Sequence, residues 1–236
     1  MGFIKRMLGI SAIIAGIYAA GYLVLNAPQF HRNFLRNKVG SEVVMLVGNQ
    51  SGGTGFAVQT PKGKTYTLTN RHICEIAQNG VLLANPGGLP LPVRVLKISK
   101  KSDLCLVENV PDKQGLRLAS NSLQAGEEFA IVGHPMLLPL TLSRGELISY
   151  QEIEMPTKVD QECDSDERQV ETMFFTVCLK KYRAGMTNAV ALGGNSGSPV
   201  VNFSGDVVGV LFAGFNDSNW GIIVPLEEIK EFLKEF

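Results

Sequence analysis

The chain has 236 residues, of which 45% are hydrophobic and 19% are charged, and its 22 basic and 22 acidic side chains balance at neutral pH. This composition supports a sizeable apolar core and argues against disorder over most of the chain. The balanced charge argues against nucleic-acid binding, which needs a basic excess or a basic face, so we expect no nucleic-acid partner.

The chain begins with an apolar segment. Residues 7–25 (MLGISAIIAGIYAAGYLVL) carry no charge and follow Lys5 and Arg6. At about 1.5 Å per residue the run spans roughly 28 Å, close to the thickness of the hydrocarbon core of a bilayer. A cleaved signal peptide and a buried soluble helix are alternatives. The run is long for a signal peptide, and Pro28 makes a poor cleavage context after Ala27. We therefore predict a single transmembrane helix.

Basic residues flank this run on both sides, so the positive-inside rule does not decide its orientation. Lys5 and Arg6 favour a cytoplasmic N-terminus and a folded domain outside the cytoplasm, in the periplasm or the external medium. We predict that residues 1–40 form the membrane anchor and a linker with a short amphipathic helix at its end, in which His31 is solvated. Residues 41–236 are predicted to form the folded domain.

From Ser41 onward, short β-branched and apolar runs alternate with Gly, Pro, Asn and Asp. This spacing, with no helical periods between the runs, predicts an all-β sandwich or barrel rather than parallel βαβ units. The expected strands are Val43–Val47, Gly55–Gln59, Thr65–Thr69, Gly80–Ala84, Val93–Ile98, Leu104–Glu108, Glu128–Val132, Leu142–Ser149, Met173–Thr176, Pro199–Asn202, Val207–Phe212 and Gly221–Val224. After them, residues 225–236 (PLEEIKEFLKEF) carry one apolar face behind an initial proline and predict an amphipathic helix that packs on the barrel.

Residues 151–171 (QEIEMPTKVDQECDSDERQVE) are rich in acids and are interpreted as a surface loop. The glycine and the spacing of a calcium-binding EF-hand loop are missing, and no cysteine lies in a C-x-x-C pair, so we expect no metal. A Cys163–Cys178 disulfide would close a loop of about 15 residues and add roughly 3 kcal/mol of stability in an oxidising compartment, and the sequence leaves this pairing open. Cys74 and Cys105 are interpreted as small buried side chains rather than as a disulfide.

The strongest chemical signal is GGNSGSPV at residues 193–200. Ser196 lies on a turn between glycines and before an apolar strand, which suits a nucleophile that projects into a cleft. The backbone N–H groups of Gly194 and Ser196 would point at the carbonyl oxygen under attack and form an oxyanion hole. A Gly-rich hairpin with a capping serine is the structural alternative.

A serine nucleophile needs a base, and the base needs an acid to orient it. His72 directly follows a β-branched strand, which is a rigid position beside a cleft, whereas His31 lies in the linker and His134 enters a turn. Asp103 begins an apolar strand, where a half-buried carboxylate can fix an imidazole. We therefore predict a catalytic triad of His72, Asp103 and Ser196.

The order His72, Asp103, Ser196 resembles that of the trypsin-like serine proteases, most closely the HtrA/Deg branch, over about residues 41–236. The corresponding blocks, in order, are SGGTGF (51–56), TLTNRHI (67–73), SDLCLV (102–107), AIVGHP (130–135), GGNSGSPVVN (193–202), and DVVGVL followed by GIIVP. The resemblance implies a chymotrypsin-like fold of two six-stranded antiparallel β-barrels with a C-terminal helix. It also implies a serine endopeptidase that acts on polypeptides and uses no cofactor.

The same resemblance places a substrate slot between uncharged segments, which implies cleavage after small or medium apolar residues rather than after Lys or Arg. The lining residues are Val190, Ala191, Leu192, Phe212, Ala213, Gly214 and Gly221.

The chain departs from the family pattern at two positions. Ser198 replaces the usual second glycine after the nucleophile, and Arg71 stands beside the base where a small residue is usual. No PDZ domain is expected after Phe236. The acidic residues 151–171 lie where the family carries mobile activation loops, so we hypothesise that they gate the site. The alternatives are an inactive protease-fold protein that binds peptides or acts as a membrane adaptor, and a soluble protease released by signal cleavage.

Overall fold

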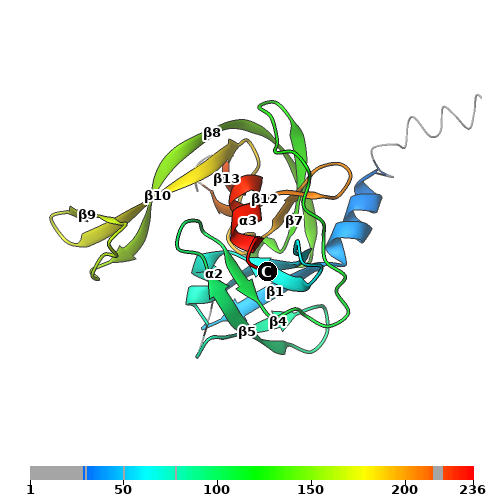
Figure 1. The fold of residues 1–236 in the computed structure, drawn as a ribbon, viewed down its shortest axis with the longest axis horizontal. Helices are drawn as coiled ribbons and strands as arrows, with labels where there is room; N and C mark the ends of the chain where they lie inside the picture. Colours follow the sequence, from blue (N-terminus) through cyan, green and yellow to red (C-terminus); the bar gives the residue numbers. More distant parts are fainter. Residues whose placement is uncertain (1–28, 30, 50, 78, 215–219) are drawn as a thin grey trace, which may run out of the picture.

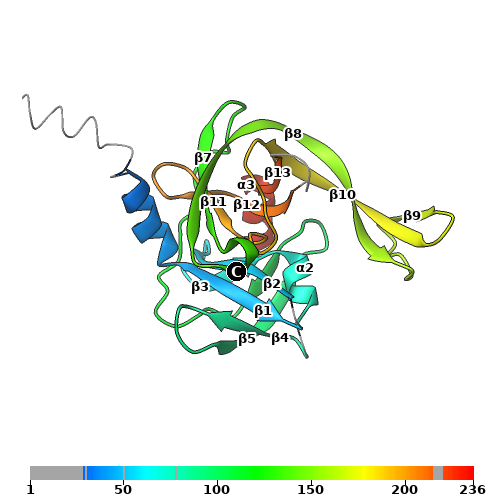
Figure 2. The same ribbon diagram turned by 180° about the vertical axis from the view of Figure 1, so that it is seen from behind.

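A computed structural model describes residues 29, 31–49, 51–77, 79–214 and 220–236. The predicted transmembrane run, residues 7–25, lies outside these described residues. Within them, every helix is too short or too polar to cross a bilayer. Residues 31–40, which the prediction assigned to the linker, form a helix beside the domain (Figure 2). Leu35 and Val39 of this helix are fully buried in the same apolar cluster as strands of the domain.

The first half of the domain is a closed six-stranded antiparallel barrel, which confirms the prediction for this half (Figure 1). Its strand order is β1-β2-β3-β6-β5-β4. A five-residue helix, α2 (Arg71–Glu75), follows the third strand. Strands are β1 (Val43–Gly48), β2 (Ser51–Gln59), β3 (Thr65–Thr69), β4 (Val81–Asn85), β5 (Leu91–Ile98) and β6 (Cys105–Val107). Because side chains alternate along a strand, Cys105 and Val107 face the interior of this barrel while Leu104 and Leu106 face the core shared with the second half.

The second half is a seven-stranded sheet with the order β13-β12-β11-β7-β8-β10-β9. The last strand of the chain, β13, also pairs with β10, so that the pairings of six strands form a ring to which β9 is added. Strands are β7 (Glu128–Gly133), β8 (Thr141–Val159), β9 (Arg168–Glu171), β10 (Thr176–Thr187), β11 (Pro199–Val201), β12 (Val207–Gly214) and β13 (Gly221–Pro225), and a 3₁₀ turn, η1 (Pro135–Leu137), joins β7 to β8. A second apolar cluster fills this half, including Phe129, Ile131 and Leu211.

The predicted C-terminal helix is confirmed as α3 (Leu226–Leu233). Its apolar face is buried at Leu226, Ile229, Phe232 and Leu233, and the last three of these join the core between the two halves.

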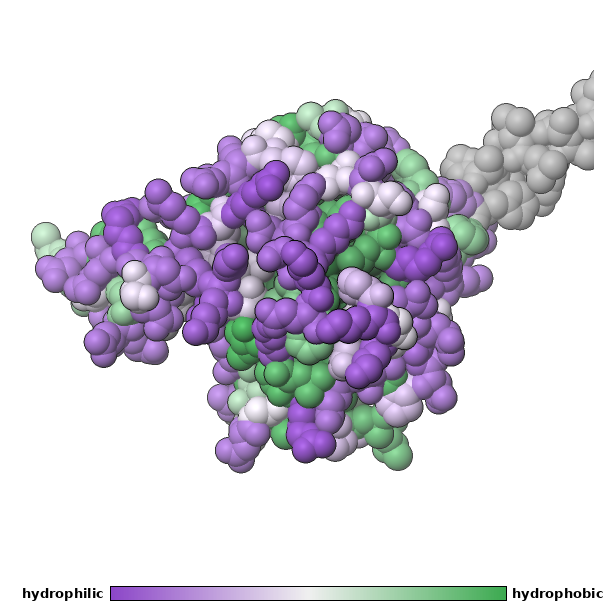
Figure 3. Space-filling model, viewed as in Figure 1, coloured by the Kyte–Doolittle hydropathy of each residue, from purple (hydrophilic) through white to green (hydrophobic). Residues whose placement is uncertain are grey.

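The interpretation of residues 151–171 as a surface loop is wrong for most of this segment, because residues 151–159 belong to β8 and residues 168–171 to β9, and it is correct only for residues 160–167. β8 and β10 pair from Leu147 opposite Thr187 to Val159 opposite Val177, and they form a long hairpin that projects from the body (Figure 1). The expected strand Met173–Thr176 is also wrong, because β10 begins at Thr176 and the side chain of Met173 is 89% exposed. The face of the hairpin that Figure 3 shows is mostly hydrophilic, and one of the buried positions of β10 is a lysine, Lys180, so hydrophobic alternation marks these strands only weakly.

Two disulfides are present in the structure. Cys163–Cys178, which the sequence left open, ties the end of the hairpin to β10. Cys74–Cys105 corrects the interpretation of these two residues as unpaired. Closure of the first barrel sets α2 against the start of β6 and brings the two Cα atoms to 6.4 Å, a separation suited to a disulfide and invisible in a sequence spacing of 31 residues.

Candidate active site

His72 and Asp103 meet at one edge of the first barrel. His72 lies in α2, and Asp103 lies in the bend just before β6. The Nδ1 atom of His72 lies 2.7 Å from Oδ2 of Asp103, and the backbone N–H of His72 donates to Oδ1 at 3.1 Å. The buried amide of Asn70 donates to the Asp103 carbonyl at 2.9 Å. The carboxylate therefore fixes both the ring and the backbone of His72.

These contacts change the basicity of the ring. Burial lowers the pKa of His72, but the hydrogen bond and the negative charge of Asp103 outweigh it, with a smaller contribution from Glu75, so the pKa is raised above 6.5. The side chain is 42% exposed, which leaves the other edge of the ring accessible. The geometry suits a base that is oriented and made more basic by an acid.

Ser196 lies on the predicted glycine turn, at the end of the loop that leads into β11. Gly194 and Gly197 have positive φ angles of 87° and 86°, a region that favours glycine. A Cβ atom on Gly197 would lie 2.0 Å from the carbonyl oxygen of Thr54, so this position also requires glycine for space. The carbonyl of Ser196 accepts a hydrogen bond from the N–H of Thr54 at 2.8 Å, which docks the turn onto β2.

The hydroxyl of Ser196 contacts a backbone carbonyl group. Among the hydrogen bonds of the described residues, Ser196 Oγ donates to the carbonyl of Phe212 at 3.5 Å, and none joins it to His72. Phe212 and His72 line the same cavity, so the two groups belong to one region of the surface. The structure therefore brings His72 and Asp103 into contact and places Ser196 nearby without a hydrogen bond to the base.

The predicted oxyanion donors are compatible with their role. Backbone hydrogen bonds within the described turn use the N–H groups of Asn195, Gly197 and Ser198, and none uses those of Gly194 or Ser196. These two N–H groups are thus not engaged in holding the turn.

The residues predicted to line the substrate slot come from segments that do lie together. A Cβ atom on Gly214 would lie 2.5 Å from the Cβ of Ala191, so there is no space for a side chain between these two residues. The side chains of Val190 and Leu192 are about half exposed, and Phe212 and Gly221 are buried. Residues 215–219 lie outside the described part of the chain.

A cavity of about 140 Å³ opens beside the base, and the hairpin forms one wall of it. Residues on its lining are Arg71, His72, Glu75, Asp103, Met155, Pro156, Thr157, Tyr182, Phe212 and Ala213. Burial and the charge of Asp103 raise the pKa of Tyr182 to about 12, which places a neutral phenol on this lining. Sequence reasoning missed the hairpin residues, although Cys178, Lys180, Tyr182 and Ala184 are buried at every second position, an alternation that could have identified β10.

The two departures from the family pattern have local explanations. Ser198 is fully buried and faces Gly133, whose missing side chain leaves room for the serine hydroxyl. The guanidinium of Arg71 forms an ion pair with Glu75 at 2.7 Å, one turn along α2.

The other two histidines lie outside this site. His31 contacts the carbonyl of Phe203 at 2.9 Å and packs against its ring, rather than being simply solvated. His134 contacts the carbonyl of Leu138 through Nδ1.

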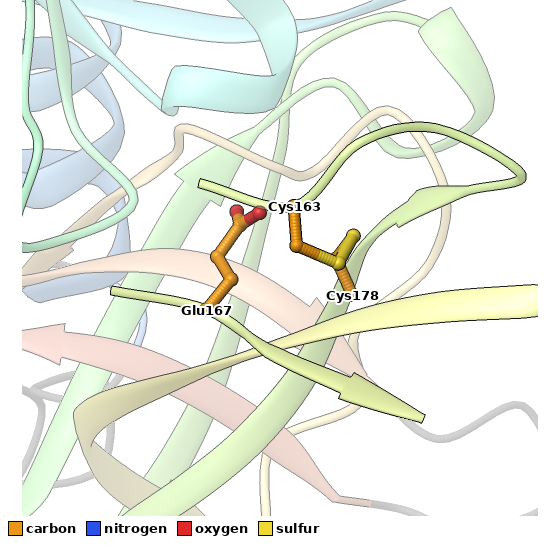
Figure 4. A group of neighbouring side chains, drawn as sticks. All are labelled: Cys163, Glu167 and Cys178. Atoms are coloured by element: carbon orange, nitrogen blue, oxygen red, sulfur yellow. A yellow bond between two sulfur atoms is a disulfide. The ribbon is translucent and has the colours of Figure 1, made fainter. Parts of the chain in front are cut away.

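One group of possible metal ligands occurs among the described residues, and it does not suit a metal. Cys163, Glu167 and Cys178 lie close together near the end of the hairpin (Figure 4). The two sulfur atoms are bonded to each other, so neither offers a thiolate.

Comparison with known proteins agrees with this fold. The family description "Trypsin-like peptidase domain" matches residues 53–210. Serine protease HTR4 of Bos taurus is 28% identical over 90% of the chain and 39% of its own length, and mitochondrial serine protease HTRA2 of Drosophila virilis is 25% identical over 78% and 39%. The chain thus spans about two fifths of the length of these relatives.

Solved structures show the same fold. The active form of the Rv3671c protease from M. tuberculosis has a TM-score of 0.70 at 19% identity, with 88% of this chain and 86% of that chain covered. A serine endoprotease from Yersinia pestis has a TM-score of 0.64 at 15% identity, with 86% and 65% covered. The family match covers more than half of the residues, and the chain belongs to the trypsin-like peptidase family, with relatives of the HtrA type.

Proposed function

We propose that the chain is a serine endopeptidase in which Ser196 is the nucleophile, His72 the base and Asp103 the residue that orients the base. The observation that supports this proposal most directly is the 2.7 Å contact between His72 Nδ1 and Asp103 Oδ2. This contact fixes the ring tautomer in which Nε2 is free to accept a proton.

Each step follows from these positions. Ser196 Oγ turns from the Phe212 carbonyl to Nε2 of His72, gives up its proton there, and attacks the carbonyl carbon of the peptide bond. The negative charge that develops on the carbonyl oxygen is stabilised by the N–H groups of Gly194 and Ser196. Protonated His72 then donates to the leaving amine, and water releases the acyl group from Ser196 by the same steps in reverse.

The substrate class is a polypeptide cut after a small or medium apolar residue. Support comes from the uncharged character of residues 190–192 and 212–214, which offer no partner to Lys or Arg. At Gly214 the absence of a side chain is needed beside this slot, because a Cβ atom there would lie 2.5 Å from the Cβ of Ala191.

The proposed location is a membrane, with residues 7–25 as a single-pass anchor and the protease domain outside the cytoplasm. Two disulfides support this location, because such bonds persist in oxidising compartments and are rare in the cytosol. Protease protection of the C-terminal domain in intact spheroplasts would contradict it.

The hairpin is proposed to gate the site. Met155, Pro156 and Thr157 of the hairpin share a cavity with His72, so a shift of the hairpin changes the space beside the base. Removal of residues 151–171 with unchanged peptidase activity would eliminate this role.

A fluorophosphonate probe tests the function directly, since it labels only a serine that has been activated by its neighbours. We expect labelling of the full chain in detergent and its complete loss in Ser196→Ala, with labelling unchanged in Ser120→Ala, a serine outside the site. Absence of labelling in the wild-type protein would instead favour the alternative of an inactive, peptide-binding member of the family.

A further inference from the structure

The Cys74–Cys105 disulfide lies directly behind the base and the acid. Cys74 follows His72 by two residues in α2, and Cys105 follows Asp103 by two residues at the start of β6. Both cysteines are buried, with exposures of 3% and 0%, in the apolar cluster inside the first barrel. A covalent bond therefore joins the short segment that carries the base to the strand that carries the acid.

The helix α2 depends on such links for its orientation. It has five residues and no side-chain hydrogen bond at its N-cap, Asn70. Helices of this length are not stable by themselves, and tertiary contacts hold them in place. Besides the disulfide, the described contacts between this segment and the acid are the two hydrogen bonds of His72 to the Asp103 carboxylate and the bond from Asn70 to the Asp103 carbonyl.

We propose that Cys74–Cys105 is a positioning element of the active site, which fixes α2 on β6 and thereby holds the imidazole of His72 against Asp103. This inference rests on the proposed peptidase function and goes beyond it. A solely structural disulfide would contribute to the free energy of unfolding and leave the chemistry of folded molecules unchanged. A positioning disulfide changes the chemistry of molecules that remain folded.

The pKa of His72 depends on the charged and titratable groups around its ring, so it can be used to detect a displacement of the ring. Asp103 faces it from the bend before β6, Arg71 and Glu75 from α2, and Tyr182 from β10. Asp103 makes the largest contribution that raises the pKa of His72, and this contribution depends on direct contact. If α2 loosens, the contact with Asp103 weakens first and the ring becomes less basic.

The test compares two disulfide deletions in the full chain. Cys74→Ala/Cys105→Ala removes the bond behind the base, and Cys163→Ala/Cys178→Ala removes the bond in the hairpin as a matched control. The rate constant and the half-saturation concentration for fluorophosphonate labelling are measured across pH, on protein shown to be folded by circular dichroism. For the first variant we expect the rate constant to fall by about tenfold to a hundredfold, because small displacements of reacting groups have effects of this size.

The pH profile separates positioning from stability. We expect the acid limb of the rate constant to move to lower pH by roughly half a unit to one unit in the first variant, because an adjacent opposite charge shifts a pKa by about one unit or more. The half-saturation concentration stays the same. The control variant keeps the wild-type acid limb even if its melting temperature falls.

Three outcomes contradict the inference or its basis. A folded Cys74→Ala/Cys105→Ala variant with the wild-type rate and acid limb overturns the positioning role alone. If that variant does not fold, Cys74→Ala/Cys105→Val, which refills the space between α2 and β6, is measured in its place. Failure of both to fold assigns the disulfide to folding and also overturns the proposal. A wild-type protein that is not labelled at Ser196 removes the peptidase function and this inference together.

Discussion

The two halves of the active site are held in different ways. His72 and Asp103 are fixed by two hydrogen bonds and lie next to a buried disulfide. Ser196, by contrast, lies on a glycine-containing loop, and its hydroxyl is bonded to a carbonyl group rather than to the base. For the proposed triad, the comparison teaches that the base and the acid are already in contact, whereas the hydroxyl of the proposed nucleophile has to turn from the Phe212 carbonyl to the base before reaction.

The difference follows from where each half is built. Strands β3 and β6 pair directly, so the residues at their ends have little freedom. The turn around Ser196 instead connects to the segment 190–193 and to η1, whose Met136 donates to the Gly193 carbonyl at 2.5 Å. Met136 and Leu137 both have positive φ angles, which are uncommon for such side chains. This half therefore contains the backbone that can change with the least disruption of the barrels.

Asp103→Asn removes the charged partner of His72 and so disrupts the half of the site that His72 and Asp103 form. An amide can still contact the ring but favours the wrong tautomer and removes the negative charge, so we expect kcat/KM to fall by about ten-thousandfold with the fold intact. The measurement is the labelling or peptide-hydrolysis rate of the folded variant. Glu108→Gln, which alters an exposed carboxylate just beyond the other end of β6, is the control and keeps the wild-type rate. A loss of less than tenfold in Asp103→Asn would show that Asp103 does not orient the base.

Gly197→Ala disrupts the other half of the site, the glycine turn that carries Ser196. The φ angle of 86° and the 2.0 Å approach of a Cβ atom to the Thr54 carbonyl leave no place for a methyl group. We expect a loss of about 3 kcal/mol in the free energy of unfolding. Urea denaturation measures it, and Gly193→Ala, where a Cβ atom meets nothing within 4 Å, is the control with a change within about 0.5 kcal/mol. Equal effects at the two glycines would contradict this account of the turn.

The raised pKa of His72 predicts how activity and stability depend on pH, and so tests the contact between the base and the acid. Because Asp103 raises the pKa above 6.5, the neutral base appears only at higher pH, and the acid limb of kcat/KM should lie above pH 6.5. The raised pKa of His72 also adds to the free energy of unfolding. This added stability is fully present below pH 6.5, the pKa of the unfolded chain, and is lost as the pH rises through the pKa of His72 in the folded protein. Melting temperatures of wild type and His72→Ala across this range measure it. A wild-type advantage that grows with rising pH would have the wrong sign.

The smallest effect is expected at the end of the hairpin. Phe174 is 86% exposed, so Phe174→Ser should change the free energy of unfolding by less than about 0.5 kcal/mol. Phe129→Ala in the second half, where the side chain is fully buried, should cost about 3–5 kcal/mol. Chemical denaturation of both variants measures the contrast. A large destabilisation by Phe174→Ser would show that the hairpin end packs against something in the folded protein.

Sequence patterns predicted the barrels well because each strand there has a buried side. Thr65–Thr69 was predicted to the residue, and α3 was recognised from its single apolar face. The patterns failed from residue 150 to residue 176, where paired strands leave the barrel and charged and polar residues are frequent. The strands there are defined by backbone hydrogen bonds, and these bonds do not depend on a pattern of hydrophobic residues in the sequence.

The sequence by itself determined the family, the order of His72, Asp103 and Ser196, and the need for glycine beside the nucleophile, because these depend on residue type and local chain geometry. Only the tertiary structure decided that Cys74 bonds to Cys105, that Tyr182 borders the base, and that the Ser196 hydroxyl is directed at Phe212. Each of these joins residues that are distant along the chain. Their contact arises when the sheets close and the hairpin folds beside α2, and neither event is encoded in a local pattern.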